Sequence, residues 1–427
     1  MTASIPIAAV EPSGNAPFPS DAMADAGIET VGAPLLNWLR EQALPRWSQT
    51  GTDRVGGGFF EQIDRRGEPV RAPRRTRVVA RQVYVFATAA RRGWMAGAEA
   101  LVEHGLDFLA QRLRLPDGTF AASCEPDGTI VDARFDLYEH AFVLFAWAAA
   151  ARCGLAPARR QQLADDALVL LQTLRSRWGH PLGGFEEGMP RTLPLRSNPH
   201  MHLLEAALEW RELSNGPAHA TWSSLADELA SLCLQRFIDA HGALRENFDG
   251  DWRPMAGAPG RRVEPGHQFE WAWLLMRWAA PGRGERVHAV ARRLLEIGEQ
   301  HGVDASRGVA VNALDATLQI TDADAKLWPQ TERIKAWHRV ADGAGADAGD
   351  GAGAAALAAA AQRHLRDAVA GLSQYLLAAP SGLWHEVLRA DGQFAPQPCR
   401  ASSLYHLVCA IDTLTSGRSP APHAAPG

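Results

Sequence analysis

A short turn recurs at regular intervals along the chain and constrains the fold more than any other sequence feature. Glycine followed by one or two hydrophobic or small residues begins at Gly58, Gly118, Gly184, Gly242, Gly308 and Gly382. Successive copies lie roughly 60 to 75 residues apart, which is the length of two helices and their connections. Six copies of such a unit predict an array of six helix pairs.

In several units a proline marks where one of the two helices is expected to begin. Pro199, Pro265, Pro329 and Pro398 form a second series along the chain, and each follows a polar or aromatic residue. Proline is favoured in the first turn of a helix because that turn does not need its missing N–H. We therefore expect these helices to start near one another at the same end of the molecule.

The hydrophobic pattern separates two kinds of helix. Residues 142–151 and 269–278 are apolar on nearly every side, whereas residues 163–175 alternate as an amphipathic helix does. Helices of the first kind are buried on more than one side, and helices of the second kind cover them. The pattern predicts an all-α fold, an (α/α)6 barrel of inner and outer helices. An open helical solenoid is the alternative.

The barrel is expected to form one domain over residues 27–416. The leader 1–26 and the tail 417–427 are rich in Ala, Pro and Ser and are predicted to be disordered, and a Gly/Ala/Asp-rich stretch near 341–354 is predicted to be a flexible insertion.

Charge and composition exclude several classes of function. The formal net charge of −5 gives no electrostatic basis for binding nucleic acid or an anionic membrane. We interpret the basic run at Arg71, Arg74, Arg75 and Arg77 as a solvated face with ion pairs. Charged residues interrupt every apolar stretch, no signal peptide begins the chain, and the scattered cysteines form no CxxC pair, so a cytoplasmic protein is expected.

Polar residues recur about one turn inside the proline-marked helices. They are His202, His267, Glu270 and Glu332, each among apolar neighbours. Buried polar groups must be hydrogen-bonded or functional, and four at similar positions favour a functional site. Glu270 lies three residues after His267 on the same helical face, so its carboxylate is expected to orient the imidazole for acid–base work.

Four further residues are candidates for a sugar site. His385 follows the last glycine turn in GLWHE, and Trp384 and Trp328 offer flat apolar faces suited to a sugar ring. Arg81 lies among apolar residues in VARQVYVF, and a buried guanidinium needs either a carboxylate partner or a substrate oxygen. From the residue alone both roles of Arg81 stay open.

Other catalytic templates are missing from the sequence. No HExxH, GxSxG, P-loop or dinucleotide-binding motif is present. His200 and His202 diverge on a helix and are poor partners for one metal ion, so neither a metal nor a cofactor is predicted. Lys and Arg are sparse at the motif positions, which favours a neutral sugar.

The chain resembles the N-acylglucosamine 2-epimerase family, and most of all its mannose isomerase branch. The motifs are RQVYVF, DLYEHAFVLFAWA, NPHMHLLEA, EPGHQFEWAWLL, LWPQTERIKA and GLWHE. The resemblance implies an (α/α)6 barrel. It implies acid–base histidines at His267 and His385, substrate-binding residues at Arg81, His202 and Tyr138, supporting carboxylates at Glu270 and Glu332, and stacking tryptophans at Trp328 and Trp384.

The expected activity is the interconversion of D-mannose and D-fructose, with D-lyxose and D-xylulose as further substrates. His385 would take the C2 proton through a cis-enediolate, His267 would assist ring opening, and Arg81 would stabilise the enediolate charge. A sugar 2-epimerase using the same histidines is the alternative. A glycoside hydrolase using Glu270 and Glu332, or a sugar- or protein-binding module, are competing classes. The expected partner is a monosaccharide, bound by a monomer or homodimer.

Overall fold

The computed structural model describes residues 28–279, 284–346 and 352–416. The predicted disordered leader and tail, 1–26 and 417–427, lie outside the described residues. The insertion predicted near 341–354 is mostly helical, because one helix continues to Ala346 and the next begins at Ala352. Only 347–351 of that stretch lie outside the described residues.

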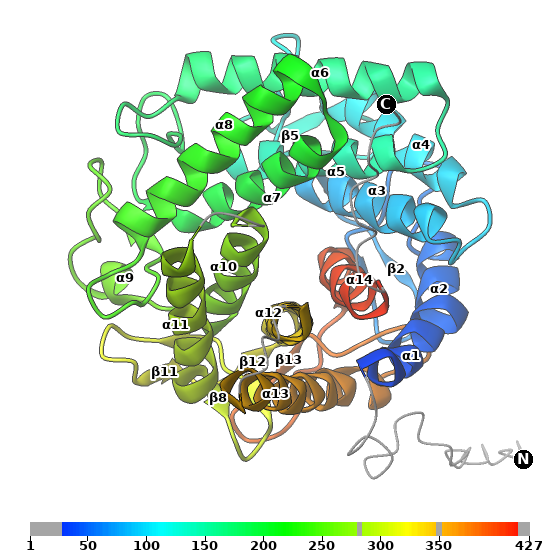
Figure 1. The fold of residues 1–427 in the computed structure, drawn as a ribbon. Helices are drawn as coiled ribbons and strands as arrows, with labels where there is room; N and C mark the ends of the chain where they lie inside the picture. The colour runs from blue at the N-terminus through cyan, green and yellow to red at the C-terminus, as the bar shows by residue number, and fades with distance from the viewer. Residues whose placement is uncertain (1–27, 280–283, 347–351, 417–427) are drawn as a thin grey trace, which may run out of the picture.

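Six helices form an inner layer around the barrel axis (Figure 1). They are α3 (Thr76–Arg91), α5 (Leu137–Arg152), α7 (Ser197–Leu213), α10 (Pro265–Trp278), α12 (Leu327–Ala346) and α14 (Ala401–Thr415). Each packs against the next, and α14 packs against α3, so the layer closes on itself. The closure confirms the (α/α)6 barrel and excludes the open solenoid.

An outer layer surrounds the inner helices (Figure 1). It consists of α1 (Ile28–Trp38) with α2 (Leu44–Gln49), α4 (Ala98–Phe108), α6 (Pro157–Trp178), α8 (Gly216–Leu232), α11 (Glu285–Gly302) and α13 (Ala352–Leu377). Single π-helical turns, η2 (Leu39–Ala43), η3 (Leu109–Leu113) and η4 (Cys233–Phe237), join or extend three of these units, and α9 (Ala258–Arg261) is one short turn. No helix within the described ranges has the length and apolar content that crossing a bilayer requires.

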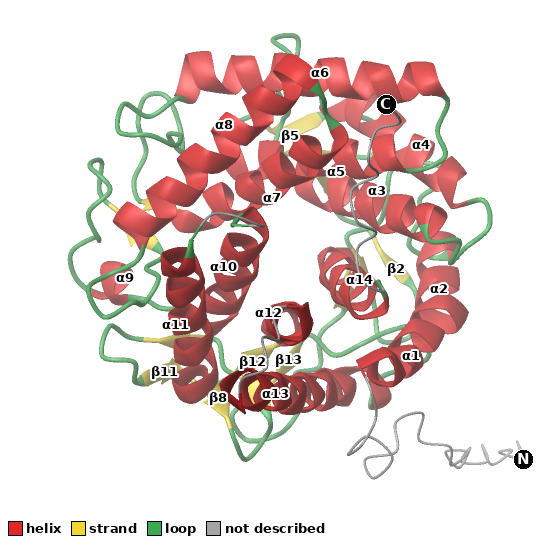
Figure 2. Cartoon of the chain, viewed as in Figure 1, coloured by secondary structure: helices red, strands yellow, loops and turns green. Residues whose placement is uncertain are grey.

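The strands are short and connect neighbouring units (Figure 2). They are β1 (Gln62–Ile63), β2 (Pro69–Val70), β3 (Arg74–Arg75), β4 (Ser123–Cys124), β5 (Ile130–Asp132), β6 (Leu195–Arg196), β7 (Asn247–Phe248), β8 (Val303–Asp304), β9 (Val309–Ala310), β10 (Ala313–Leu314), β11 (Ile320–Asp322), β12 (Ala325–Lys326), β13 (Val387–Leu388) and β14 (Cys399–Arg400). All pairings are antiparallel. β12 pairs with β13, and β14 pairs with β1, which ties the last unit to the first.

The recurring glycine turns are held to the inner helices by one repeated hydrogen bond. The fourth residue of an inner helix accepts the backbone N–H of the residue that follows the turn. His140 accepts from Phe120 at 3.1 Å and His200 from Phe185 at 2.9 Å. Gln268 and Gln330 do the same for the next two units, at 3.0 and 2.8 Å. These buried histidines therefore satisfy the backbone and do not face the barrel axis.

Candidate active site

A cavity of about 570 Å³ opens at the end of the barrel where the inner helices begin. This volume lies within the range of about 300–1,000 Å³ that is usual for small-molecule sites. The second residue of four inner helices lines it: Tyr138, Asn198, Trp328 and Ser402. Connections between the units complete the wall with Glu264, Asn312, Asp324, Lys326, Glu386, Val387, Gln397 and Arg400.

The sixth residues of the six inner helices form a ring across the barrel. They are Arg81, Phe142, His202, Glu270, Glu332 and His406, and we call them the sixth-residue ring. Arg81, His202, Glu270 and His406 line the cavity. Each of the six is buried. Equivalent positions on the six inner helices lie at the same depth along the barrel axis, and here five of the six side chains are polar.

His267, the third residue of α10, lies in the cavity wall. Its Nδ1 is 2.8 Å from the Glu246 carboxylate and 3.9 Å from Glu264, and its Nε2 is 3.3 Å from the Asn198 amide. Burial opposes the charged ring, but the two carboxylates outweigh it and raise the pKa of His267 to about 9. The imidazole is therefore protonated at neutral pH. Glu246 orients the ring, so the expectation that Glu270 does so is wrong.

The second imidazole of the cavity belongs to His406. Its Nδ1 lies 2.9 Å from Oε1 of Glu332, which leaves Nε2 as the free ring nitrogen. Burial lowers the pKa of His406 to about 4, although Glu332 opposes the shift. This ring is neutral at pH 7. The cavity wall thus carries the protonated His267 and the neutral His406; burial also lowers the pKa of His202, the third imidazole of the lining, to about 4.

Trp328 lies beside both histidines. Its ring centroid is 5.0 Å from that of His267 and 5.8 Å from that of His406. Gly266, the second residue of α10, makes room for it, because a Cβ there would lie 2.5 Å from the indole. The placement agrees with the predicted apolar face for a sugar ring.

His385 and Trp384 lie outside the cavity, so the prediction that they line it is wrong. The His385 Nε2 is 3.0 Å from the carbonyl oxygen of Ala378, and its ring stacks on Phe394 at 4.2 Å. Trp384 is 2% exposed and stacks on Trp47 of α2 at 5.1 Å. Trp384 is the hydrophobic residue of the sixth glycine turn, and that position packs into the layer between the inner and outer helices.

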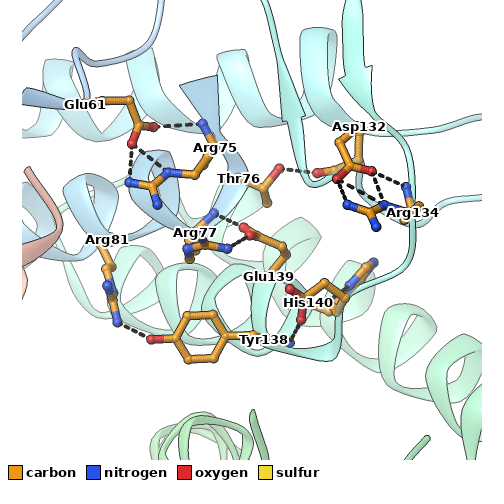
Figure 3. A network of polar contacts seen from close by, with 12 residues as sticks. Glu61, Arg75, Thr76, Arg77, Arg81, Asp132, Arg134, Tyr138, Glu139 and His140 are labelled. Carbon is orange, nitrogen blue, oxygen red and sulfur yellow. Dashed lines mark hydrogen bonds and ion pairs between the residues drawn. The ribbon is translucent and has the colours of Figure 1, made fainter. Parts of the chain in front are cut away.

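Arg81 and Tyr138 form one side of the cavity (Figure 3). The guanidinium donates to the Tyr138 hydroxyl at 2.8 Å and lies 4.1 Å over the Phe142 ring. Its buried Nε has no protein partner among the described residues. No carboxylate within the described ranges forms an ion pair with Arg81, so its positive charge is available to an oxygen in the cavity.

Arg74, Arg75 and Arg77 of the basic run at the start of α3 form ion pairs as predicted, but Arg74 is buried and does not belong to a solvated face. Arg74 lies 2.8 Å from Asp53, and Arg75 lies 2.5 Å from Glu61. Arg77 pairs with Glu139, the third residue of α5 (Figure 3). These pairs hold the start of α3 to its neighbours and leave Arg81 as the cation that enters the cavity from this helix.

A buried ammonium lies beneath the sixth-residue ring. Lys335 is fully buried, with Nζ 2.6 Å from Oε2 of Glu332 and 3.9 Å from Oε1 of Glu205. Burial opposes its charge, but these carboxylates outweigh the effect and raise the pKa of Lys335. Lys335 and the His406 hydrogen bond in turn lower the pKa of Glu332 against the effect of burial.

The pKa values of Glu205 and Glu270 are shifted in opposite directions. Hydrogen bonds from His202 and from the Tyr405 hydroxyl, together with Lys335, lower the pKa of Glu205 to about 2 despite its burial. Burial and the nearby Glu332 raise the pKa of Glu270 well above its ordinary value. The environment therefore favours the charged form of Glu205 and the neutral form of Glu270.

His202, Glu205 and Glu270 are near enough to share one metal ion, with their donor atoms all within 4.8 Å of one another. Tyr405 and His202 already occupy Glu205, and the Lys335 ammonium is 3.9 Å from it. A second cation beside Lys335 would be repelled. The donor set therefore fits a metal poorly, and independence from metal stays a prediction.

Sequence reasoning missed Glu246, His406 and Lys335, and also the cavity cations Lys326 and Arg400. Glu246 has a signal in the sequence: in the first, third, fourth, fifth and sixth units a carboxylate or amide follows the glycine turn and accepts the N–H just before the inner helix. His406 escapes the sequence analysis because Pro398 predicts too early a start for its helix. α14 begins three residues later, at Ala401.

Comparisons with a family model and with individual proteins indicate the same protein family. The family model of N-acylglucosamine 2-epimerase matches residues 58–410. A protein named mannose-6-phosphate isomerase from Rhizobium meliloti is 46% identical over 388 residues, covering 90% of this chain and 96% of the relative. A D-mannose isomerase from Thermobifida fusca is 32% identical over 214 residues, covering 47% of this chain and 51% of the relative.

Solved structures share the fold. A crystal structure of D-mannose isomerase superposes with a TM-score of 0.77 at 20% identity, covering 89% of this chain and 96% of that chain. Cellobiose 2-epimerase from Bacillus thermoamylovorans superposes with a TM-score of 0.73 at 16% identity, covering 89% and 99%. At these identities the likeness concerns the fold alone.

Proposed function

The chain belongs to the N-acylglucosamine 2-epimerase family, and from that premise we propose that it is a sugar isomerase of the mannose isomerase type. The reaction interconverts a mannose-type aldose and the corresponding fructose-type ketose, with the lyxose–xylulose pair as shorter analogues. The relative that is 46% identical over 90% of the chain supports the class of reaction.

One observation carries the proposal: one protonated and one neutral imidazole flank Trp328 in one cavity. Aldose–ketose isomerisation needs a base to take a proton from carbon and an acid to protonate oxygen. When the protein environment shifts the pKa values of two groups apart, the group that stays unprotonated can act as the base and the group that stays protonated can act as the acid. The neutral His406 is the base, and the protonated His267 is the acid.

The proton transfers balance without a co-reactant. His267 protonates the ring oxygen and takes up the proton of the anomeric hydroxyl, so it is protonated again once the ring has opened. His406 then takes the C2 proton while His267 protonates O1, which gives a cis-enediol. Arg81 stabilises the negative charge that develops on the oxygens during this step. His406 returns its proton to C1 while the O2 hydroxyl gives its proton back to His267, and the ketose forms.

A 2-epimerase using the same residues is the second candidate function. Epimerisation requires a proton at C2 from the opposite face, and His267 is the other acid on the cavity wall. An N-acylglucosamine 2-epimerase from Bos taurus aligns over 29% of this chain at 29% identity, less than the isomerases do. The wider alignment favours isomerisation.

The geometry disfavours a glycoside hydrolase. Its two carboxylates would both need to face the substrate. Glu332 does not line the cavity, because His406 and Lys335 occupy its two oxygens. A binding module is also disfavoured, since it has no use for two imidazoles with opposed pKa shifts.

Incubation of mannose in heavy water, followed by NMR, tests the reaction. Fructose formed before glucose, with deuterium entering C1, agrees with isomerisation. Glucose formed first establishes the epimerase instead. The same assay in the presence of a chelator tests metal independence, since loss of turnover would contradict it.

A further inference from the structure

Two cations lie on the cavity wall away from the sixth-residue ring. Lys326 ends β12, and Arg400 ends β14. Both flank the segment Glu386–Val387, because Lys326 is the β-partner of Val387 and the backbone N–H of Arg400 donates to Glu386 at 2.7 Å. The two side chains therefore approach one part of the cavity from either side.

Neither cation forms an ion pair among the described residues, although the charge of Lys326 acts to lower the pKa of Glu264 and that of Arg400 acts to lower the pKa of Glu386. Within the described ranges, no carboxylate lies within 4.0 Å of the Lys326 ammonium or the Arg400 guanidinium, and the side-chain partner of Arg400 is the neutral Gln397 at 3.4 Å. Lys326 is half-buried, so its charge is partly shielded from water. Cations without partners in a cavity are available to an anionic ligand.

The acidic residues on the same wall are already engaged. Glu264 accepts from Arg262 at 2.8 Å. Glu386 accepts from the Trp384 indole, the Ser403 hydroxyl and the Arg400 N–H, and burial raises its pKa. Asp324 accepts from the N–H of Ala390 at 2.9 Å. Asn312, Gln397 and Ser402 add neutral donors to this wall.

We propose that Lys326 and Arg400 form a subsite for a phosphate group carried by the sugar at the end remote from C1 and C2. The preferred substrate is then an aldose 6-phosphate of the mannose type, which replaces the expectation of a neutral sugar. This inference rests on the proposed isomerase function of the same cavity. The histidine end reacts and the Lys326–Arg400 end holds the anion.

The subsite should act as a specificity device. Hydrogen bonds from Lys and Arg to a phosphate are charge-assisted, and Arg adds a fork of donors that matches phosphate oxygens. A sugar without the phosphate forfeits these contacts and leaves the half-buried Lys326 and the exposed Arg400 without an anionic partner. We expect kcat/KM for mannose 6-phosphate to exceed that for mannose by about 100-fold or more.

Steady-state kinetics of the full chain test the subsite. The double variant Lys326→Gln, Arg400→Gln should lower the ratio of kcat/KM for mannose 6-phosphate to that for mannose by about 10-fold to 100-fold, the loss expected for hydrogen bonds to a charged group. Arg389→Gln is the matched control, because Arg389 is an exposed cation on the adjoining turn that does not line the cavity. It should leave the ratio unchanged.

Inorganic phosphate provides a second readout that does not require turnover of a phosphorylated sugar. It should inhibit the wild-type isomerisation of mannose and lose its effect in the double variant. Equal kcat/KM values for the two sugars, or a double variant that leaves their ratio unchanged, would overturn the subsite while the isomerase stands. Absence of turnover with both sugars would overturn the proposed function itself.

Discussion

The fourth and the last units of the barrel use the same framework but place their imidazoles at different depths. In each, a carboxylate lies four residues after the turn glycine, Glu246 after Gly242 and Glu386 after Gly382. Each carboxylate accepts the N–H just before the inner helix and a side-chain donor from the third residue of that helix. That third residue is His267 in the fourth unit and Ser403 in the last.

The imidazole of the last unit lies one turn deeper, at His406 in the sixth-residue ring, where the fourth unit has Glu270. The residue just before the carboxylate points away from the cavity in both units. Arg245 pairs with Asp239 and the carbonyl of Arg261, and His385 bonds to the carbonyl of Ala378. A shared backbone framework therefore does not require the reactive groups to occupy equivalent positions.

The sharpest test of the comparison replaces each of the two histidines of the last unit by alanine in a separate variant. His406→Ala should lower kcat by about 10² to 10⁴, the usual contribution of an acid–base group. His385→Ala should retain wild-type kcat, because its ring faces Phe394 outside the cavity. Steady-state rates of both variants, with circular dichroism to establish that each is folded, measure the difference. A large loss in His385→Ala alone would contradict the assignment.

Removal of the buried ammonium of Lys335 on α12 tests the support of Glu332, the carboxylate that holds His406 of the last unit. Lys335→Met leaves the Glu332 carboxylate without its partner at 2.6 Å. Breaking a buried ion pair from one side costs about 3–5 kcal/mol, and we expect that fall in the free energy of unfolding. Urea denaturation measures it. Lys326→Met is a control, as that half-buried cation has no carboxylate partner within the described ranges, and it should unfold near the wild-type midpoint.

The role of Glu246 in the fourth unit is tested by the pH dependence of the reaction. The wild-type rate should fall below about pH 4 as His406 gains a proton, and above about pH 9 as His267 loses one. Glu246→Gln removes the nearer carboxylate that raises the pKa of His267, so the alkaline limb should move to lower pH. We expect kcat at neutral pH to fall about 10-fold to 100-fold, as for a lost hydrogen bond to a charged group. An unmoved alkaline limb would show that Glu246 does not set this pKa.

Ser403→Ala is the corresponding change in the last unit and should have the smallest effect. It removes one hydrogen bond, at 2.8 Å, from a Glu386 that keeps the Trp384 and Arg400 donors. A loss of about 1 kcal/mol in the free energy of unfolding is expected. Thermal or urea denaturation will measure it. A loss in kcat comparable to that of Glu246→Gln would mean that the two units are more alike than the structure indicates.

Much of the candidate site was predictable because the repeat and the motifs are local. Arg81, His202, His267, Glu270 and Trp328 were predicted as site residues, and all of them line the cavity. Tyr138 does as well, and Glu332 lies beneath it as the partner of His406. These residues share a position on an inner helix. A proline or neighbouring aromatic residues indicate where such a helix starts, so the depth of each side chain along the barrel follows from counting residues.

The sequence by itself determined an array of six helix pairs with apolar inner helices, through the spacing of the glycine turns and the hydrophobic pattern. Tertiary structure decided that this array closes into a barrel and is not an open solenoid, because α14 packs against α3. Tertiary structure alone decided which of two nearby histidines enters the cavity. The direction of His385 depends on packing of Trp384 against Trp47, more than 300 residues earlier in the chain. The ionisation of the site was likewise invisible in the sequence, because a pKa depends on burial and on charges that separate helices bring together.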